Sequence, residues 1–286
     1  MHQNAIYKPV QAKHFGQQIH SSIFQRTAKA TYLIMVQISL TALVAFVGTL
    51  AHFAVAAPSG SPAEHDKRAA NCNFPNPPAS SNVRLNSPRV IGKYFNGGGR
   101  RYGRGVRCND KTEHGQQQAV FVLEAGATLE NAVIGADANE GVHCNGPCTL
   151  RNVWFEDVCE DGVTFFQKSG ISFVYGGGSK NAVDKVFQHN GGGKVFIDSF
   201  CAIGFGTFYR SCGNCPTQVK REVEIQNVIA RNGRLLAGMN SNYGDLAIIR
   251  SNTNQLTNVN WVCNSYIGNN RGAASQPSST NQRNGV

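Results

Sequence analysis

Between Glu140 and Arg210 the chain concentrates most of the side chains that could do chemistry together. Carboxylate oxygens are the ligands that a hard cation such as calcium prefers. A nearby lysine can move a proton, and an arginine can hold an anion through two parallel hydrogen bonds. The stretch therefore predicts a cation site beside an anionic substrate. Its acids are Glu140, Glu156, Asp157, Glu160, Asp161 and Asp184, and its cations of interest are Lys185 and Arg210.

Two pairs of adjacent acids differ in what they predict. Glu156 and Asp157 are typical of solvated turn charges rather than of ligands. Neighbouring residues of a strand face opposite sides, so Glu160 and Asp161 bind one ion together only if they lie on a turn.

The elements that must position these residues read as short strands. Beta-branched runs recur along the chain, and the reference positions Leu129, Leu150, Phe173 and Val195 are 21, 23 and 22 residues apart, with Ile225 and Ile248 continuing the series. Repeats of this length are too short for a strand–helix–strand unit and predict an all-β, right-handed parallel β-helix. A β-sandwich, the alternative, has strands every 8–12 residues.

The turns of such a solenoid have their own signature. We expect Asn131, Asn152, Asn227 and Asn258 to stack there as hydrogen-bonded ladders, because asparagine tolerates left-handed turn conformations. The solenoid domain is predicted over 69–271, and the polar segment 272–286 is expected to be disordered.

The N-terminal third of the chain has the pattern of a processed leader. Residues 36–56 are apolar and uncharged and end in small residues, which predicts a signal peptide over 35–57; a membrane anchor is the alternative. Met35 precedes the run, so residues 1–34 are interpreted as an over-extended start. A short pro-segment over 58–68 ends in the dibasic pair Lys67–Arg68.

Net charge points to an anionic partner. The formal charge is +10, and removal of residues 1–68, with six basic and two acidic residues, leaves 21 basic against 15 acidic. A secretory route favours an extracellular acidic polysaccharide over nucleic acid. We expect a secreted monomer without stable membrane association once the signal is removed.

All nine cysteines follow the leader, at positions 72, 108, 144, 148, 159, 201, 212, 215 and 263. In an oxidising compartment they predict disulfides that staple the loops, with connectivity left open. A zinc site from Cys144, Cys148, Cys212 and Cys215 is the alternative. The odd count leaves one free thiol, which we assign to Cys201 in an apolar run.

Five blocks of the sequence stand out as long, specific motifs: EGVHC, CTLRNVWFEDVCEDG, KNAVDKVFQHNGGG, YRSCGNC and GMNSNYGD. Together they resemble family 3 of the polysaccharide lyases, the secreted pectate lyases, and the likeness runs from about Phe74 to Asn270. The resemblance implies a compact parallel β-helix that requires Ca2+ and cleaves polygalacturonate, or demethylated pectin, by β-elimination.

The resemblance also implies roles for individual residues. It places Glu140, Glu160, Asp161 and Asp184 as calcium ligands. Lys185 matches the lysine of an aspartate–lysine–valine motif and is expected to be the base. Arg210 is expected to clamp substrate, with the two roles open to exchange. Arg221 is a candidate substrate contact or a surface charge. His143 and His189 are candidates for an acid or base, but the resemblance favours a structural role for both.

Three departures from the family pattern leave other functions open. Thr207 stands where the family has a lysine, Val183 where it has an aspartate, and Phe166 where it has a further lysine. A non-catalytic or weakly active pectin-binding or host-interacting protein is therefore one alternative. A polygalacturonase-type hydrolase, which needs no calcium, is another.

Overall fold

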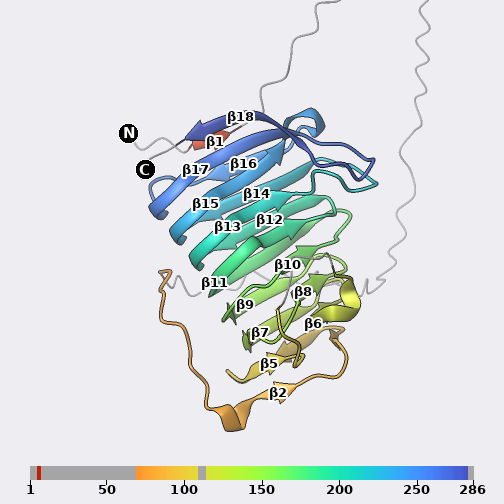
Figure 1. The fold of residues 1–286 in the computed structure, drawn as a ribbon, viewed down its shortest axis with the longest axis vertical. Helices are drawn as coiled ribbons and strands as arrows, with labels where there is room; N and C mark the ends of the chain where they lie inside the picture. Colours follow the sequence, from red (N-terminus) through yellow and green to blue (C-terminus); the bar gives the residue numbers. More distant parts are fainter. Residues whose placement is uncertain (1–4, 8–68, 109–113, 283–286) are drawn as a thin grey trace, which may run out of the picture. The chain divides into compact units, whose positions relative to one another are not determined.

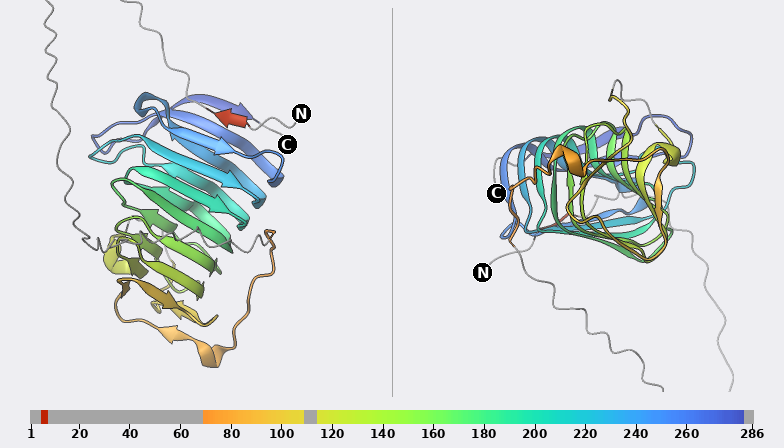
Figure 2. Two further views of the ribbon diagram at one scale, coloured as in Figure 1. Left: turned by 180° about the vertical axis from the view of Figure 1, so that it is seen from behind. Right: turned by 90° about the horizontal axis from the view of Figure 1, so that it is seen from below.

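A computed structural model describes residues 5–7, 69–108 and 114–282, which form a parallel β-solenoid of about six turns (Figure 1). Successive coils lie nearly on top of one another when viewed along the stack (Figure 2, right). Every pairing between neighbouring coils is parallel. The predicted all-β parallel β-helix is confirmed.

The coils present three parallel faces. The first, here called the site face, is built from β3 (Arg89–Ile91), β6 (Ala119–Leu123), β8 (Glu140–Cys144) and β10 (Asp161–Phe165), and continues through the C-terminal parts of β11 (Ile171–His189), β13 (Cys201–Ser211), β15 (Ile229–Asn240) and β17 (Gln255–Ile267).

The other two faces use the remaining strands. The second contains β4 (Tyr94–Asn96), the beginnings of β7 (Thr128–Ile134), β9 (Thr149–Phe155) and β11, then β12 (Gly193–Asp198), β14 (Arg221–Gln226) and β16 (Leu246–Ile249). The third starts with β2 (Val83–Arg84) and β5 (Arg101–Gly103) and uses the ends of β7 and β9. Three single-turn 3-10 helices, η1 (Ala79–Ser81), η2 (Gln116–Gln118) and η3 (Ser241–Tyr243), lie in connections.

Inward-facing residues of successive coils stack into one core. On the site face Val142, Val163, Phe187 and Tyr209 are neighbours in register, and none is exposed. Each strand buries its inner side only because the next coil covers it, which explains why the sequence repeats.

The repeat was predicted correctly in length but not in register. Leu150 pairs with Val174 rather than Phe173, and Val174 pairs with Ile197 rather than Val195. Because side chains alternate across a strand, the one-residue shift places Phe173 outside the core. There its ring contacts Tyr175, with centroids 5.6 Å apart.

The asparagine ladder is confirmed at two places. Asn131 and Asn152 have φ of 51° and 52°, and the Asn152 amide donates to Asn131 Oδ1 over 2.8 Å. The Asn258 amide donates in the same way to Asn232 Oδ1 over 3.1 Å. Asn227 has φ of 53° but donates to Asp198 instead.

Eight of the cysteines form four disulfides, so the predicted disulfides are confirmed and the zinc alternative is wrong. The assignment of the free thiol to Cys201 is also wrong: Cys201 bonds Cys72, whose segment crosses the solenoid to reach it. The buried Cys263 is the free cysteine. The pairs are Cys72–Cys201, Cys108–Cys159, Cys144–Cys148 and Cys212–Cys215.

The two ends of the chain each add one antiparallel strand. The segment 272–286 was expected to be disordered, yet Gln276–Gln282 forms β18 and pairs with the last coil strand, β17. That pairing satisfies backbone groups of an edge strand, a benefit that low sequence complexity does not reveal.

Of the region assigned to an over-extended start, the described part is β1 (Ala5–Tyr7), antiparallel to β16. The predicted signal peptide over 35–57 and pro-segment over 58–68 lie outside the described residues. In the described part of the chain, no helix has the length and apolarity to span a membrane.

Candidate active site

Strand pairing on the site face aligns residues from four successive strands. This line of residues, here called the row, consists of Glu140, Asp161, Lys185 and Thr207. Asp161 at the start of β10 pairs with Lys185 of β11, and Lys185 pairs with Thr207 of β13. Glu140 begins the preceding strand β8. Residues far apart in sequence therefore become neighbours because each coil places the same position above the last.

Three carboxylates in this row or directly beside it are buried. Glu140, Glu160 and Asp161 are 3%, 1% and 5% exposed. Glu160 lies in the bend before β10, whereas Asp161 is the first residue of that strand, so only one of the two acids lies on a turn. Such burial of acids is unfavourable without compensating charge.

The pKa values of these acids reflect that burial. Burial raises the pKa of Glu160 to about 7, helped by a hydrogen bond and repulsion from Glu140 and opposed by the backbone N–H of His114. Burial likewise raises the pKa of Asp161 well above its usual range, although Lys185 opposes the rise.

Lys185 is held between two carboxylates. Its Nζ lies 2.5 Å from Asp184 Oδ2 and 3.2 Å from Asp161 Oδ1, and the residue is 8% exposed. Burial disfavours the ammonium, but the attraction of Asp161 and Asp184 outweighs it and leaves the pKa of Lys185 raised. The Asp184 side chain, at 41% exposure, connects this buried pair to solvent.

Arg210 lies on the same face but is already engaged. Nη1 donates to the carbonyls of Ser211 and Gly238 and to Asn240 Oδ1, and Nη2 donates to Ser275 Oγ over 2.7 Å. The guanidinium carbon stands 4.1 Å from the Tyr266 ring centroid. Burial lowers the pKa of Arg210 to about 10.

Arg221 is not placed for the expected contact with substrate. The residue has 0% exposure, and its guanidinium donates to Asn190 O, Val219 O and Gln218 Oε1. Its backbone N–H donates to the buried Asp245 of the GMNSNYGD block. The arginine ties its own connection, through Gln218 and Val219, to Asn190 of the preceding coil. The sequence could not show the contact with Asn190, because the two residues are 31 positions apart.

The two histidines are buried, as a structural role requires. His189 contacts Tyr209 Oη at 2.7 Å and Gly192 O at 3.1 Å, and burial lowers its pKa to about 3. His143 belongs closer to the site than expected, since its Nε2 lies 3.2 Å from Glu140 Oε2. Burial lowers the pKa of His143 to about 4, so its ring is neutral there.

The adjacent acids Glu156 and Asp157 do not join the row. Glu156 accepts two hydrogen bonds of 2.8 Å from Arg101 Nε and is only partly exposed, so it is an ion-pair partner rather than a solvated charge. Burial raises the pKa of Asp157, which also accepts a hydrogen bond from Asn181.

The donor set fits a calcium ion in chemistry. All its groups are carboxylates, which calcium prefers. Asp161 Oδ1 is buried and, despite its 3.2 Å approach to Lys185, has no aligned hydrogen-bond donor. Among the described residues, however, no three acidic, histidine or cysteine side chains already converge as a bound metal would require.

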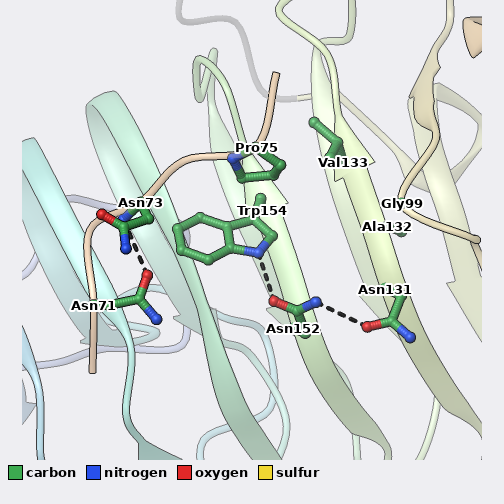
Figure 3. A pocket seen from close by; sticks show the side chains of 9 residues that line it. All are labelled: Asn71, Asn73, Pro75, Gly99, Asn131, Ala132, Val133, Asn152 and Trp154. Atoms are coloured by element: carbon green, nitrogen blue, oxygen red, sulfur yellow. Dashed lines mark hydrogen bonds between the residues drawn. The ribbon is translucent and has the colours of Figure 1, made fainter. Parts of the chain in front are cut away.

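A separate pocket of about 290 Å³ lies on the third face (Figure 3). Asn131, Asn152 and Trp154 line it together with Asn71 and Asn73 of the N-terminal segment. The Trp154 indole donates to Asn152 Oδ1 over 2.7 Å. The pocket has no acid or base, so it does not carry the chemistry predicted from the sequence.

Arg234 is the residue near the row that sequence reasoning missed. Its Nη2 donates to Thr207 Oγ1 over 3.0 Å. Counting one repeat on from Thr207 would have found its strand, but the long excursion through Cys212 and Cys215 breaks the regular spacing.

Comparison with known proteins places this fold and site. The pectate lyase family profile matches residues 73–272. Pectate lyase E of Emericella nidulans is 50% identical over 206 residues, which cover 72% of this chain and 79% of that protein. A probable pectate lyase D of Neosartorya fischeri is 49% identical over 201 residues, covering 70% and 83%.

Solved structures agree. The catalytic domain of pectate lyase PelI from Erwinia chrysanthemi superposes with a TM-score of 0.59 at 27% identity, covering 68% of this chain and 91% of that domain. PelI in complex with tetragalacturonic acid gives a TM-score of 0.56 at 29% identity, covering 66% and 62%.

Fold and site together define a β-solenoid enzyme of the polysaccharide lyase class. The chain belongs to the pectate lyase family, as its resemblance to family 3 of the polysaccharide lyases implied, and it is a pectate lyase enzyme. The hydrolase alternative is therefore wrong.

Proposed function

We propose that this enzyme is a secreted, calcium-dependent lyase that cleaves polygalacturonate by β-elimination, with Lys185 as the base. The observation that carries the proposal is the buried Lys185 between Asp161 and Asp184, on the same face as Glu140 and Glu160. A polyanionic substrate is supported by PelI, which was solved with tetragalacturonic acid.

Calcium would be held by Glu140, Glu160, Asp161 and Asp184. When bound, it supplies Lewis-acid stabilisation of the charge that develops beside the uronate carboxylate. Asp161 and Asp184 are the two groups that raise the pKa of Lys185. A cation held by Asp161 and Asp184 would offset their attraction for the lysine, so that burial would favour the neutral amine. Lys185 Nζ can then accept the carbon-bound proton.

Arg210 is proposed to clamp a substrate carboxylate. Its Nη2 has one protein partner outside the solenoid coils, the Ser275 hydroxyl in the segment before β18. A carboxylate would bind a guanidinium more strongly than a neutral hydroxyl does, because the hydrogen bonds are charge-assisted. We expect substrate to displace Ser275.

The cysteine chemistry supports the proposed secretion. Four disulfides are stable in an oxidising compartment and rare in the cytosol. With the leader pattern of residues 35–57, they favour an extracellular enzyme that meets pectin directly. We propose that it acts as a monomer.

The test is a lyase assay on polygalacturonate with calcium, following ultraviolet absorbance of the unsaturated product. Lys185→Ala should lower the rate by about 100-fold or more, the usual contribution of a general base. Lys168→Ala, at an exposed lysine away from the row, is the matched control. Equal rates for Lys185→Ala and wild type would refute the assignment of the base. Calcium-dependent binding without product from the wild type would instead select a non-catalytic pectin-binding protein.

A further inference from the structure

The side chain of Arg234 is an exposed cation beside the row that holds Lys185. Arg234 precedes Leu235 on β15; Leu235 pairs with Thr207, and Thr207 pairs with Lys185. The Arg234 guanidinium reaches back across the strands to donate to Thr207 Oγ1. The hydrogen bond to Thr207 thus holds the Arg234 guanidinium close to the row.

Arg234 has no acidic partner among the described residues. Two other arginines of the solenoid do have such a partner: Arg101 pairs with Glu156, and Arg250 pairs with Glu224. Thr207 is a neutral acceptor and takes one of the five N–H donors of the guanidinium. The remaining donors and the whole positive charge of Arg234 stay available to a ligand.

Gly206, directly before Thr207, packs closely against β11. A Cβ added there would lie 2.5 Å from the Val183 carbonyl oxygen and 2.8 Å from the Asp184 carbonyl oxygen, so a larger residue would clash. No side chain therefore stands at this position between the half-buried Asp184 on β11 and Arg234 on β15.

We infer that Arg234 binds the carboxylate of a uronate residue adjacent to the one that reacts, and that Thr207 is its positioning residue. The inference rests on the proposed function, since it assigns a subsite on the same face. A polyuronate carries a carboxylate on every sugar, so a substrate held at Lys185 presents further anions nearby. A guanidinium matches a carboxylate in geometry and binds it through two hydrogen bonds.

Kinetics of Arg234→Gln on polygalacturonate tests the subsite. We expect KM to rise about tenfold with kcat nearly unchanged, because a ground-state contact to a charged group is lost. Arg234→Lys should recover part of the loss. Thr207→Val should raise KM about threefold, since it removes the acceptor that orients Arg234 but not its charge. Arg231→Gln, an exposed arginine three residues earlier on β15, is the matched control and should leave KM unchanged.

Binding separates a carboxylate contact from a purely structural role. In a Lys185→Ala background, Arg234→Gln should weaken binding to polygalacturonate but not to highly methyl-esterified pectin, which lacks the charge. Equal weakening on both polymers, or equal effects of the Arg231 and Arg234 changes, would overturn the inference. So would an unchanged affinity for polygalacturonate. Because binding needs no turnover, this comparison holds even if the wild type proves unable to cleave the polymer.

Discussion

The raised pKa of Glu160 should make the stability of the folded protein depend on pH. Its pKa is raised from an ordinary 4.5 to about 7, first by burial and then by Glu140. A carboxyl with a higher pKa in the folded than in the unfolded state contributes its full stabilisation at pH values below the unfolded-state pKa. That contribution is lost as pH rises through about 7, because the ionised form is penalised in the folded state. A cation bound to the carboxylate would remove the penalty.

Calcium should therefore raise the thermal midpoint of unfolding more at pH 8 than at pH 5. Chelation should reverse the gain at pH 8 and change little at pH 5. Differential scanning fluorimetry at both pH values checks this. Glu160→Gln is the control, which should be more stable than wild type at pH 8 without calcium and should gain less from it. A calcium shift that is the same at both pH values would contradict the prediction.

Arg221 tests the distinction between a buried structural cation and a substrate contact. Arg221→Ala would strand the acceptors Asn190 O, Val219 O and Gln218 Oε1. We expect a loss of roughly 3 kcal/mol in the free energy of unfolding. Urea unfolding measures the loss, while KM on polygalacturonate should stay within about twofold of wild type. A large rise in KM with little change in stability would restore the role expected from the sequence.

For individual residues, the sequence predicted which side chains belong to the site better than it predicted the partners that they contact. The acids, Lys185 and Arg210 fall on one face because a regular repeat brings equivalent positions together. Most partners of Arg210, Arg221 and Arg234 lie tens of positions away or in irregular connections. No periodicity specifies which of these a long guanidinium side chain reaches.

At the level of secondary structure, Asn152 has two roles: its backbone forms a left-handed turn, and its side chain makes hydrogen bonds. The backbone there has φ of 52°, which asparagine tolerates, and the side chain accepts from the buried Trp154 indole while donating to Asn131. The ladder was predictable because asparagine recurs at the repeat length. The tryptophan contact was not, because it depends on the exact strand register.

Asn152→Ala should lower the free energy of unfolding by about 2–3 kcal/mol. The left-handed conformation becomes strained, and the indole N–H loses its acceptor. Asn152→Gly relieves the strain but not the lost hydrogen bonds, so it should be less destabilising. Chemical denaturation of the two variants separates the terms. Equal losses would mean that the backbone conformation contributes nothing.

For the whole molecule, the disulfides divide into long and short loops. Cys72–Cys201 spans 129 residues, whereas Cys144–Cys148 spans four. The long bridge ties the segment around Phe74 to the coils, where the Phe74 ring meets Trp154 edge-on at 4.9 Å. Sequence alone left the connectivity open because spacing does not reveal which segments cross the solenoid.

Removing the long bridge should destabilise the enzyme more than removing the short one. In the chain-entropy view a loop of this length contributes up to about 5 kcal/mol, against about 2 kcal/mol for a five-residue loop. The paired changes Cys72→Ser with Cys201→Ala, and Cys144→Ser with Cys148→Ala, compared by denaturant unfolding, check the order. A larger loss for the short bridge would show that packing around the bridges, not loop closure, decides.

Strand β18 affects how copies of the protein can associate with one another. The last coil of a parallel stack offers a row of backbone donors and acceptors on which a further coil, including one from another copy, can pair. Here β18 covers β17 from Trp261 to Ile267 in the opposite direction, and β1 covers β16. A neighbouring copy thus meets a strand of the wrong polarity for continuing the stack. In concentrated solution the enzyme should therefore diffuse as separate particles instead of growing into fibres.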